Sequence, residues 1–241
     1  MVGFYLTFVK FFNEMKFTSR FDFKSDLLFE SLNNKELALI NSVEEVMCFS
    51  KGDKIFYEDG IPTGMYQLVS GRVKKYKTVI DQQQQIFYIY TKNDIFGYHA
   101  LLSENRYQDA CEALEDVEIN FISKDNFEML LQKIPKLKDA LLYNMAHEFG
   151  VLVNIIAVLA QKSQNIRLAL FLMILEKRFK LKDEKSLGVD ITREDLANII
   201  GTSRESLSRS LSVLKKEGLI EVDKRLITVI DKKKLEKFIG L

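Results

Sequence analysis

One stretch near the C-terminus, residues 191–218, limits what this chain can fold into more than any other. Its sequence, ITREDLANIIGTSRESLSRSLSVLKKEG, predicts two short helices joined at Gly201, a residue type that tolerates positive φ. Ser203 is a good N-cap for the second helix, which we expect to run to about Lys216. Along this helix the leucines fall on one side and the polar residues on the other, which is typical of a helix-turn-helix.

The polar side of the second helix has the chemistry of a surface that contacts DNA bases. It carries Arg204, Glu205 and Arg209. A carboxylate facing a phosphate-rich duplex is repelled unless it accepts a specific hydrogen bond, and a cytosine amino group in the major groove offers one to Glu205. Each arginine can donate two hydrogen bonds to guanine or can grip phosphates. The alternative is an i, i+4 ion pair between Glu205 and Arg209 on a solvated helix.

Residues 219–230 alternate apolar and polar side chains around Asp-Lys-Arg, which predicts a two-stranded hairpin. A hairpin directly after a helix-turn-helix is typical of a winged helix. Residues 191–222 closely resemble the winged helix of the Crp/Fnr transcription regulators. The resemblance implies that Arg204, Glu205 and Arg209 contact bases in a GTGA-like half-site. The chain departs from the family pattern at Ser210, where an aliphatic residue is usual, so the packing there stays open.

We expect the other DNA contacts to position the protein on the phosphate backbone. The residues expected to make them are Thr192, Ser203, Ser206, Ser208, Lys224 and Arg225. The charge distribution favours this placement, because residues 164–241 hold 17 Lys and Arg against 12 Asp and Glu, whereas residues 1–163 hold 18 against 22. A basic C-terminal module suits nucleic-acid binding, although a lysine-rich solvated surface gives the same balance.

The composition is ordinary for a folded soluble protein, with 47% hydrophobic and 29% charged residues, and 241 residues suffice for two modest domains. Cys48 and Cys111 are far apart, so we expect no disulfide framework, no thiolate metal site and a reducing, cytoplasmic location. An Fnr-type iron–sulfur cluster would need four thiolates. His99 and His147 alone cannot form a multi-histidine site, so we expect no metal ion.

The first residues, MVGFYLTFVKFF, are apolar enough to be weighed as a targeting segment. They have no basic start, Lys10 interrupts them, and no small-residue cleavage site follows. They are also too short to span a bilayer. We therefore expect residues 1–20 to be an N-terminal extension, either an upstream start or a flexible arm, and we expect no membrane partner.

From Val43 to Ile122 the sequence changes to short β-branched and aromatic runs that are separated by turn residues. Regularly spaced short strands of this kind predict a sandwich or roll. The order of the runs resembles the cyclic-nucleotide-binding-type β-roll of the same family. Residues 81–85, DQQQQ, are expected to form a hairpin tip, and residues 26–42 a short helix that leads into the roll.

The effector pocket of the family can be compared with this chain residue by residue. Phe96-Gly97-Tyr98 stands where cyclic-AMP-binding members carry FGE, whose glutamate bonds the ribose hydroxyl. Tyr107-Gln108-Asp109 stands where they carry the arginine–serine pair that clamps the phosphate, and no arginine is present there. The resemblance implies these pocket residues: Gly97, Tyr98, His99, Ala100, Tyr107, Gln108 and Asp109. We expect that cyclic AMP does not bind in the usual mode, because Asp109 would repel its phosphate.

Two residues of this region have simpler explanations than ligand chemistry. His99 has the chemistry of an axial haem ligand, but a loop histidine bonded to backbone or water is the simpler expectation. Cys111 is expected to pack on a strand rather than to sense oxidants, because no adjacent basic residue would lower its pKa. We therefore assign no cofactor, and the effector stays unidentified.

The residues after Pro135 predict a long helix, because proline suits the first turn of a helix. Apolar residues recur there at alternating spacings of three and four: Leu142, Met145, Phe149, Leu152, Ile156 and Leu159. Such a heptad row predicts a partner helix and a two-fold homodimer, although packing on the roll also uses neighbours such as Val151 and Ile155. Residues 161–165 suggest a hinge before a second amphipathic helix over 166–179.

These features predict an α+β chain of three parts after the extension: a jelly-roll-type sensory β-roll (21–135), a dimerisation helix with a hinge (136–163) and a winged helix-turn-helix domain (164–241). We predict a bacterial, non-enzymatic transcription regulator whose homodimer binds double-stranded DNA at an inverted repeat, with RNA polymerase as a further partner. Its effector is predicted not to be cyclic AMP.

Several alternatives stay open. The regulator can be effector-independent, or it can respond to cyclic nucleotides through a non-standard pocket. A cupin-like metalloenzyme would need several inward-facing histidines. A winged helix that binds protein instead of DNA is the remaining class.

Overall fold

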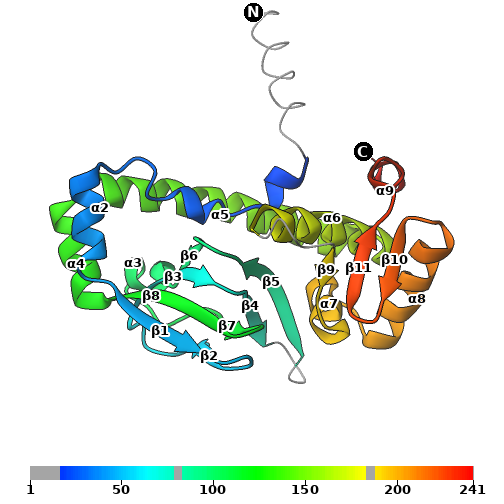
Figure 1. Cartoon of the computed structure of the whole chain (residues 1–241), viewed down its shortest axis with the longest axis horizontal. Helices are drawn as coiled ribbons and strands as arrows, with labels where there is room; N and C mark the ends of the chain where they lie inside the picture. The colour runs from blue at the N-terminus through cyan, green and yellow to red at the C-terminus, as the bar shows by residue number, and fades with distance from the viewer. Residues whose placement is uncertain (1–16, 79–82, 183–187, 241) are drawn as a thin grey trace, which may run out of the picture.

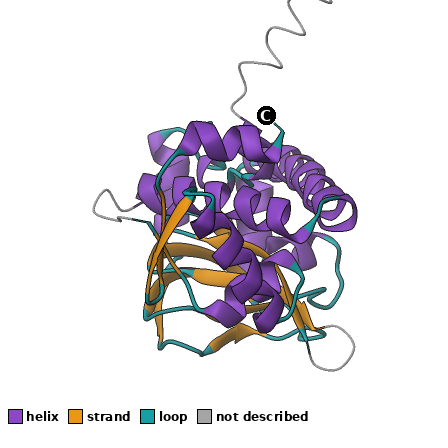
Figure 2. Ribbon diagram, turned by 90° about the vertical axis from the view of Figure 1, so that its right-hand side faces the viewer, coloured by secondary structure: helices purple, strands orange, loops and turns teal. Residues whose placement is uncertain are grey.

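The computed structural model describes residues 17–78, 83–182 and 188–240. The apolar residues 1–12, considered above as a targeting segment, lie outside the described residues. The described elements line up along one long helix, with the strands beneath it and a winged helix at its far end (Figure 1). Figure 2, seen from that end, shows helices gathered on one side of the molecule and the strands of the roll on the other.

Two four-stranded antiparallel sheets form an N-terminal β-roll, as the sequence predicts, with strand orders β1-β8-β3-β6 and β2-β7-β4-β5. The strands are β1 (Glu45–Phe49), β2 (Lys54–Phe56), β3 (Gly64–Ser70), β4 (Val73–Thr78), β5 (Gln84–Tyr90), β6 (Ile95–Phe96), β7 (Ala110–Ala113) and β8 (Val117–Ser123). Inward-facing side chains such as Leu68, Val73 and Ile119 are fully buried and form the core of the roll. The predicted class, α+β, is therefore confirmed.

Helices frame this roll. They are η1 (Phe17–Phe21), η2 (Ser25–Leu27), α2 (Asn34–Asn41), α3 (Tyr98–Leu102), α4 (Lys124–Lys133), α5 (Pro135–Gln161) and α6 (Gln164–Lys182). The prediction of one lead-in helix over 26–42 is wrong in extent, because the α-helix begins only at Asn34. Asn33 sets that start: its side chain accepts a hydrogen bond from the Glu36 N–H (3.1 Å), and the Glu36 carboxylate accepts one from the Asn33 N–H (2.8 Å).

The winged helix follows a break at Lys162 and Ser163. Its first helix is α6, and its other elements are β9 (Val189–Asp190), α7 (Arg193–Ile200), α8 (Arg204–Lys216), β10 (Ile220–Asp223), β11 (Leu226–Val229) and α9 (Lys232–Ile239). The predicted second helix of the helix-turn-helix (α8) and the hairpin after it (β10 and β11) are confirmed. Ser203 caps α8 as expected by accepting a hydrogen bond from the Ser206 N–H. Strand β9 and helix α9 were not predicted. Strand β9 is only two residues long and exists by pairing with β11.

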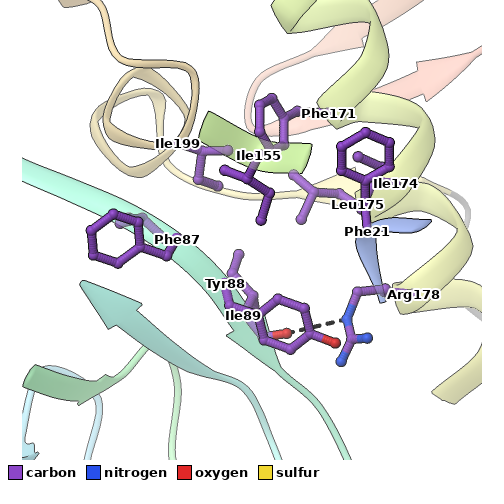
Figure 3. A pocket seen from close by; sticks show the side chains of 11 residues that line it. Phe21, Phe87, Tyr88, Ile89, Ile155, Phe171, Ile174, Leu175, Arg178 and Ile199 are labelled. Atoms are coloured by element: carbon purple, nitrogen blue, oxygen red, sulfur yellow. Dashed lines mark hydrogen bonds between the residues drawn. The ribbon is translucent and has the colours of Figure 1, made fainter. Parts of the chain in front are cut away.

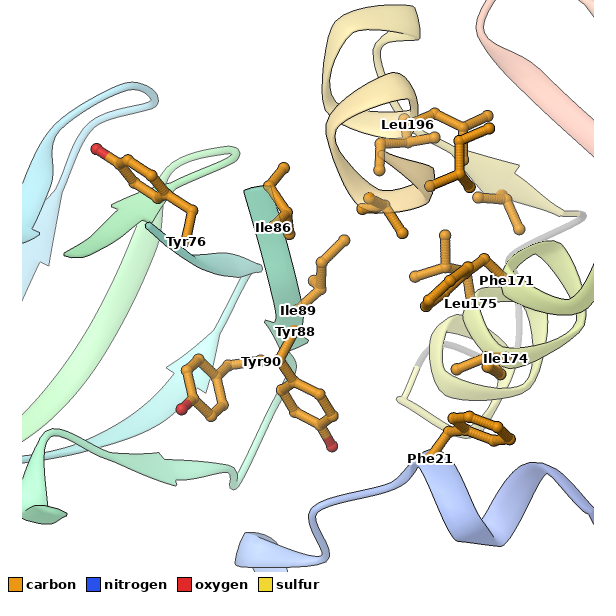
Figure 4. Packing of buried hydrophobic residues seen from close by; sticks show 14 of the residues in the cluster. Phe21, Tyr76, Ile86, Tyr88, Ile89, Tyr90, Phe171, Ile174, Leu175 and Leu196 are labelled. Carbon is orange, nitrogen blue, oxygen red and sulfur yellow. The ribbon is translucent and has the colours of Figure 1, made fainter. Parts of the chain in front are cut away.

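The winged helix packs directly on the roll through one continuous apolar core. Figure 4 shows Tyr88 and Ile89 of β5 on the side of that strand that faces Phe171, Ile174 and Leu175 of α6. The same junction encloses an apolar cavity of about 20 Å³ (Figure 3). A space of that size holds about one water molecule, so it is a packing defect rather than a ligand site.

The glutamine-rich run contributes to this junction. Gln84 and Gln85 belong to strand β5, so the prediction of a hairpin tip is wrong for these two residues. The amide of Gln85 donates hydrogen bonds to the carbonyls of Asn198 (2.8 Å) and Ile199 (3.1 Å) in α7. Asp81 and Gln82 lie outside the described residues. A side chain expected at an exposed turn therefore joins the two domains.

Arg178 of α6 is the most connected charge at the junction. Its guanidinium is almost fully buried and pairs with Asp22 of the N-terminal lead-in and with Asp94 of the roll. Its Nε also donates to the Ile89 carbonyl (3.2 Å; Figure 3), and the guanidinium lies over the Tyr88 ring. Although burial works against the charge, its tyrosine and carboxylate neighbours raise the pKa of Arg178. One side chain thus holds three separate segments together.

Arg178→Met should lower the free energy of unfolding by about 3–5 kcal/mol, because the substitution removes the cation that neutralises the buried Asp94 carboxylate. Chemical denaturation followed by circular dichroism measures this change. Lys92→Met, at an exposed position two residues from Asp94, is the matched control and should be almost neutral. A loss below about 1 kcal/mol for Arg178→Met would contradict the structural role of this ion-pair cluster.

Candidate DNA-binding surface and sensor pocket

Helix α8 presents one apolar and one polar face, as predicted. Leu207, Leu211 and Leu214 are buried against the domain core. The three residues expected to contact bases are all exposed on the outer face of its first two turns: Arg204, Glu205 and Arg209. The fold therefore brings the two guanidinium groups and the carboxylate together on one accessible surface.

Glu205 is poised as a hydrogen-bond acceptor. Hydrogen bonds from its own backbone N–H and from the Ser203 hydroxyl, helped by the charges of Arg204 and Arg209, hold its pKa below the usual range. An ionised carboxylate can only accept hydrogen bonds, which suits a donor such as a base amino group. Arg209 donates to the Ser206 hydroxyl at 2.6 Å, so this guanidinium is held in place along the helix.

The residues expected to contact the DNA backbone divide into two groups. Ser203, Ser206 and Ser208 lie on the N-terminal half of α8, where the Ser208 hydroxyl donates to the Arg204 carbonyl (3.0 Å). Lys224 and Arg225 form the exposed turn of the wing between β10 and β11, and Arg225 pairs with Asp190 at 3.2 Å.

Thr192 lies at the start of α7 and lines the same cleft as the wing residue Arg225. It caps α7, accepting a hydrogen bond from the Asp195 N–H (3.0 Å) and donating its hydroxyl to the Asp195 carboxylate. That carboxylate is 3.2 Å from Lys74 of the roll, and Thr192 itself lines the cleft between the two domains. Its contacts in this arrangement are with the protein.

The predicted effector pocket contains a network of buried polar side chains. Gly97 has a left-handed conformation (φ 84°), and an added Cβ would lie 2.7 Å from the Tyr66 ring, so both the backbone and the space favour glycine. Helix α3 starts there and carries Tyr98, which is fully buried, and its hydroxyl donates to Glu148 of α5 (2.9 Å). Asn144, one turn earlier in α5, donates to the Tyr98 oxygen (2.7 Å) and to Glu148 (2.8 Å). Tyr98, which stands where the resemblance places a ribose-binding glutamate, therefore links the roll to α5.

The predicted phosphate position is also occupied by an internal pair. Asp109 lies 2.9 Å from the amino group of Lys75, which is buried on β4. Burial alone would lower the pKa of Lys75, but the attraction of Asp109, with smaller contributions from Cys111 and Glu148, more than offsets it and raises this pKa. Asp109 is therefore neutralised by Lys75, which the sequence comparison did not identify.

The remaining pocket candidates are not all directed at this network. His99 lies in helix α3 rather than in a loop, and its Nε2 is 2.9 Å from the second oxygen of Glu148. Tyr107 stacks on Phe56 with ring centroids 3.9 Å apart, Ala100 is buried, and Gln108 is exposed. The contact between His99 and Glu148 favours an internal structural role for this histidine over that of a haem ligand.

Lys75, Asn144 and Glu148 are the residues that sequence reasoning missed. Asn144 and Glu148 stand four residues apart in α5, so they share one face, which is otherwise lined by Leu141, Val151 and Ile155. That spacing was the available signal, because a polar pair on a buried face needs partners there. Cys111, in contrast, packs on β7 as expected, and burial raises the pKa of its thiol well above the ordinary value.

Helix α5 has a second, unpartnered face. Leu142, Phe149 and Ile156 of the predicted heptad row are 62, 70 and 61% exposed, whereas Met145, Leu152 and Leu159 are partly buried. The row that faces the roll starts one residue earlier: Leu141, Asn144, Glu148, Val151, Ile155 and Val158. By length and composition α5 could also cross a membrane, but this is weak support because core helices of soluble proteins pass the same test.

Among the described residues, no group of three or more His, Cys, Asp and Glu side chains is arranged to hold a metal ion. Cys48 is exposed on β1, while Cys111 is buried on β7. In the predicted pocket, Tyr98, Asn144 and Glu148 are bonded to one another, and Asp109 is paired with Lys75.

Comparison with known proteins assigns both domains to the families that the sequence resembles. Residues 46–134 match the cyclic nucleotide-binding domain family, and residues 166–238 match the Crp-like helix-turn-helix domain family. Electron transport regulator A of Shewanella oneidensis is 27% identical over 213 residues, which cover 87% of this chain and 85% of that protein. The anaerobic regulatory protein of Haemophilus influenzae is 28% identical over 204 residues, which cover 83% and 79%.

The structure of FixK2 from Bradyrhizobium japonicum has the same fold, with a TM-score of 0.72 at 24% identity over 83% of this chain and 98% of that one. The two family matches together span about two thirds of the sequence, in the order roll then helix-turn-helix. The chain therefore belongs to the Crp/Fnr family of DNA-binding transcription regulators.

Proposed function

We propose that this regulator acts as a homodimer that binds an inverted repeat with GTGA-like half-sites. The observation that carries the proposal is the exposed apolar row on α5, at Leu142, Phe149 and Ile156. These residues recur every seven positions, so they form a stripe that a second copy of the same helix can cover. Contiguous apolar stripes of this kind are rarely left in water.

A two-fold dimer would also place two copies of α8 for binding to one operator. Two recognition helices related by two-fold symmetry enter successive major grooves about 34 Å apart, which requires an operator with inverted symmetry. The α5 helices would lie at the centre, with a winged helix following each of them. We place this dimer in the cytoplasm, where double-stranded DNA is its main partner and RNA polymerase a further one.

Phe149→Glu should convert the dimer to monomers, because it puts a charge in the middle of the apolar row. Light scattering after size-exclusion chromatography should then give the mass of one chain instead of two. Operator affinity should fall by about a hundredfold or more, because the half-sites no longer bind as one unit. Ile61→Glu, at a residue 71% exposed in the turn between β2 and β3, is the matched control and should stay dimeric. Wild-type protein that runs as a monomer would contradict the proposal.

We assign the base contacts to three side chains. Arg204 and Arg209 each donate to guanine, and Glu205 accepts from a cytosine amino group. Their common exposure on α8 supports this assignment, as does the lowered pKa of Glu205. The hydroxyls of Ser203, Ser206 and Ser208 and the wing residues Lys224 and Arg225 position the helix on phosphates, with Thr192 as the least favoured contact.

Glu205→Ala should relax discrimination at one base pair of the half-site by about 1–3 kcal/mol, because the acceptor for the base amino group is lost. Fluorescence anisotropy with matched and single-mismatch operators at fixed salt measures this difference. Glu118→Ala, at an exposed position on β8, is the control for removing one carboxylate. Equal losses of affinity on matched and mismatched operators would rule out a base contact by Glu205.

We propose that the signal is not cyclic AMP bound in the family's usual mode. The buried pair of Lys75 and Asp109 and the network around Tyr98 support this view, because a bound nucleotide would have to break both. A buried polar group that loses its partner is costly, and the nucleotide phosphate would also meet Asp109. The same network suits a regulator with no small effector, which we keep as the second possibility beside a nucleotide-binding pocket of a non-standard kind.

Titration calorimetry with cyclic AMP should detect no binding at micromolar concentrations, because Tyr98 is bonded to Glu148 and Asp109 to Lys75. A known cyclic-AMP-binding regulator measured in parallel checks the assay. Stoichiometric, micromolar binding by this protein would overturn the proposed occupancy of the pocket.

A further inference from the structure

Ser210 marks a polar position on the buried face of the recognition helix. Its side chain is 3% exposed and lies in the same helix face as Leu207, Leu211 and Leu214. A hydroxyl buried among leucines destabilises a protein unless it finds a hydrogen-bond partner. The partner is the side-chain amide of Gln164, whose nitrogen donates to the Ser210 oxygen at 2.7 Å.

Gln164 makes two further hydrogen bonds at the same place. Its nitrogen also donates to the backbone carbonyl of Ser206 (2.7 Å), and its oxygen accepts from the Thr202 hydroxyl (2.9 Å). One amide therefore contacts α8 at two positions one turn apart and contacts the turn that precedes it. A carboxylate could not replace it, because the Ser206 carbonyl can only accept and therefore needs a donor.

Gln164 lies at the connection between α5 and α6, so its contacts tie that connection to α8. Helix α5 ends at Gln161, and Gln164 is the first residue of α6, so only Lys162 and Ser163 separate them. One turn later, the guanidinium of Arg167 lies 3.4 Å from both the Leu159 carbonyl of α5 and the Gly201 carbonyl of the helix-turn-helix. The start of α6 thus meets the end of the proposed dimer helix and the recognition helix at once.

Apolar packing alone would fix the rotation of α8 about its axis less strictly than the hydrogen bonds of Gln164 do. Contacts among leucines have little directional preference, so a small rotation of α8 on α6 changes them less than it changes hydrogen bonds. Hydrogen bonds at fixed distances on two successive turns restrict that rotation. The orientation of the α8 outer face then follows the orientation of α6.

We infer that Gln164 is a positioning residue for DNA binding, which locks the recognition helix to the first turn of α6 so that the hinge angle at Lys162 and Ser163 sets the direction of α8. This inference rests on the proposed dimer, because a fixed direction matters most when two recognition helices must match two half-sites. Gln164 itself touches no DNA. Its effect is on which half-site spacing the dimer accepts.

The test compares operators that differ only in half-site spacing. An operator is first selected from random DNA with the wild-type protein, and versions with one or two base pairs added or removed are then made. Gln164→Ala should bind the selected operator about tenfold more weakly and should lose most of the preference for its spacing. Discrimination between bases within a half-site should stay at the wild-type level, because Arg204, Glu205 and Arg209 are unchanged.

Two further variants separate positioning from loss of structure. Ser210→Ala removes the buried acceptor while keeping a good helix former, and it should flatten the spacing preference in the same direction. The double variant with Gln164→Ala should be no worse than Gln164→Ala alone, since both changes break one network. Asn165→Ala, in the same turn of α6, is the matched control and should keep the wild-type spacing profile. Thermal unfolding shows whether each variant is folded. If Gln164→Ala does not fold, the spacing profile of Ser210→Ala tests the inference.

The outcomes separate this inference from the proposal on which it rests. A wild-type protein that ignores spacing would contradict the two-fold dimer, and the role of Gln164 falls with it. A wild-type protein that discriminates, together with folded Gln164→Ala and Ser210→Ala variants that lose affinity equally at every spacing, would overturn the positioning role alone.

Discussion

Helix α5 carries two rows of side chains on one backbone, and the placement of every other element depends on keeping them distinct. The row that includes Leu141, Val151 and Ile155 is buried on the roll. Leu142, Phe149 and Ile156, each one residue after a buried position, stay exposed. Because neighbouring residues in a helix are about 100° apart, both rows fit on 27 residues without competing for the same surface. The roll fixes how α5 is rotated, and that rotation determines which apolar stripe a second copy of the chain would meet.

The junction between the roll and the winged helix combines an apolar core with buried charges. Arg178 connects α6 to two carboxylates across the boundary, and Lys74 pairs with Glu112 of the roll and with Asp195 of α7. Buried ion pairs add little net stability, because desolvation offsets much of their attraction. They are strongly directional, however, and a change in the docking angle would leave a buried charge unpaired. The polar contacts therefore select this angle, while the apolar contacts supply most of the stability.

In the predicted pocket of the roll, buried polar side chains bond to one another. Glu148 of α5 is 2% exposed and accepts hydrogen bonds from Tyr98 and Asn144, with His99 at its other oxygen. A buried carboxylate is stable only with such partners. These bonds run from the roll to the proposed dimer helix, which is the direction in which a bound effector would have to act. The connection between sensor and dimer helix is thus present without any added molecule.

Local patterns alone determined the helix-turn-helix, its N-cap at Ser203, the start of α5 at Pro135 and the roll, because capping, periodicity and turn residues act over a few positions. Resemblance then gave the roles expected of Arg204, Glu205 and Arg209. What the tertiary structure decided was every pairing between distant residues. The sequence shows no partner for Ser210, and the fold supplies Gln164 from 46 positions away. Likewise, the sequence shows Asp109 as an isolated negative charge, and the fold pairs it with Lys75. Gln85 and Glu148 found their partners in the same way. Such partners depend on which surfaces the fold brings together, and nothing in the spacing of a single segment encodes them.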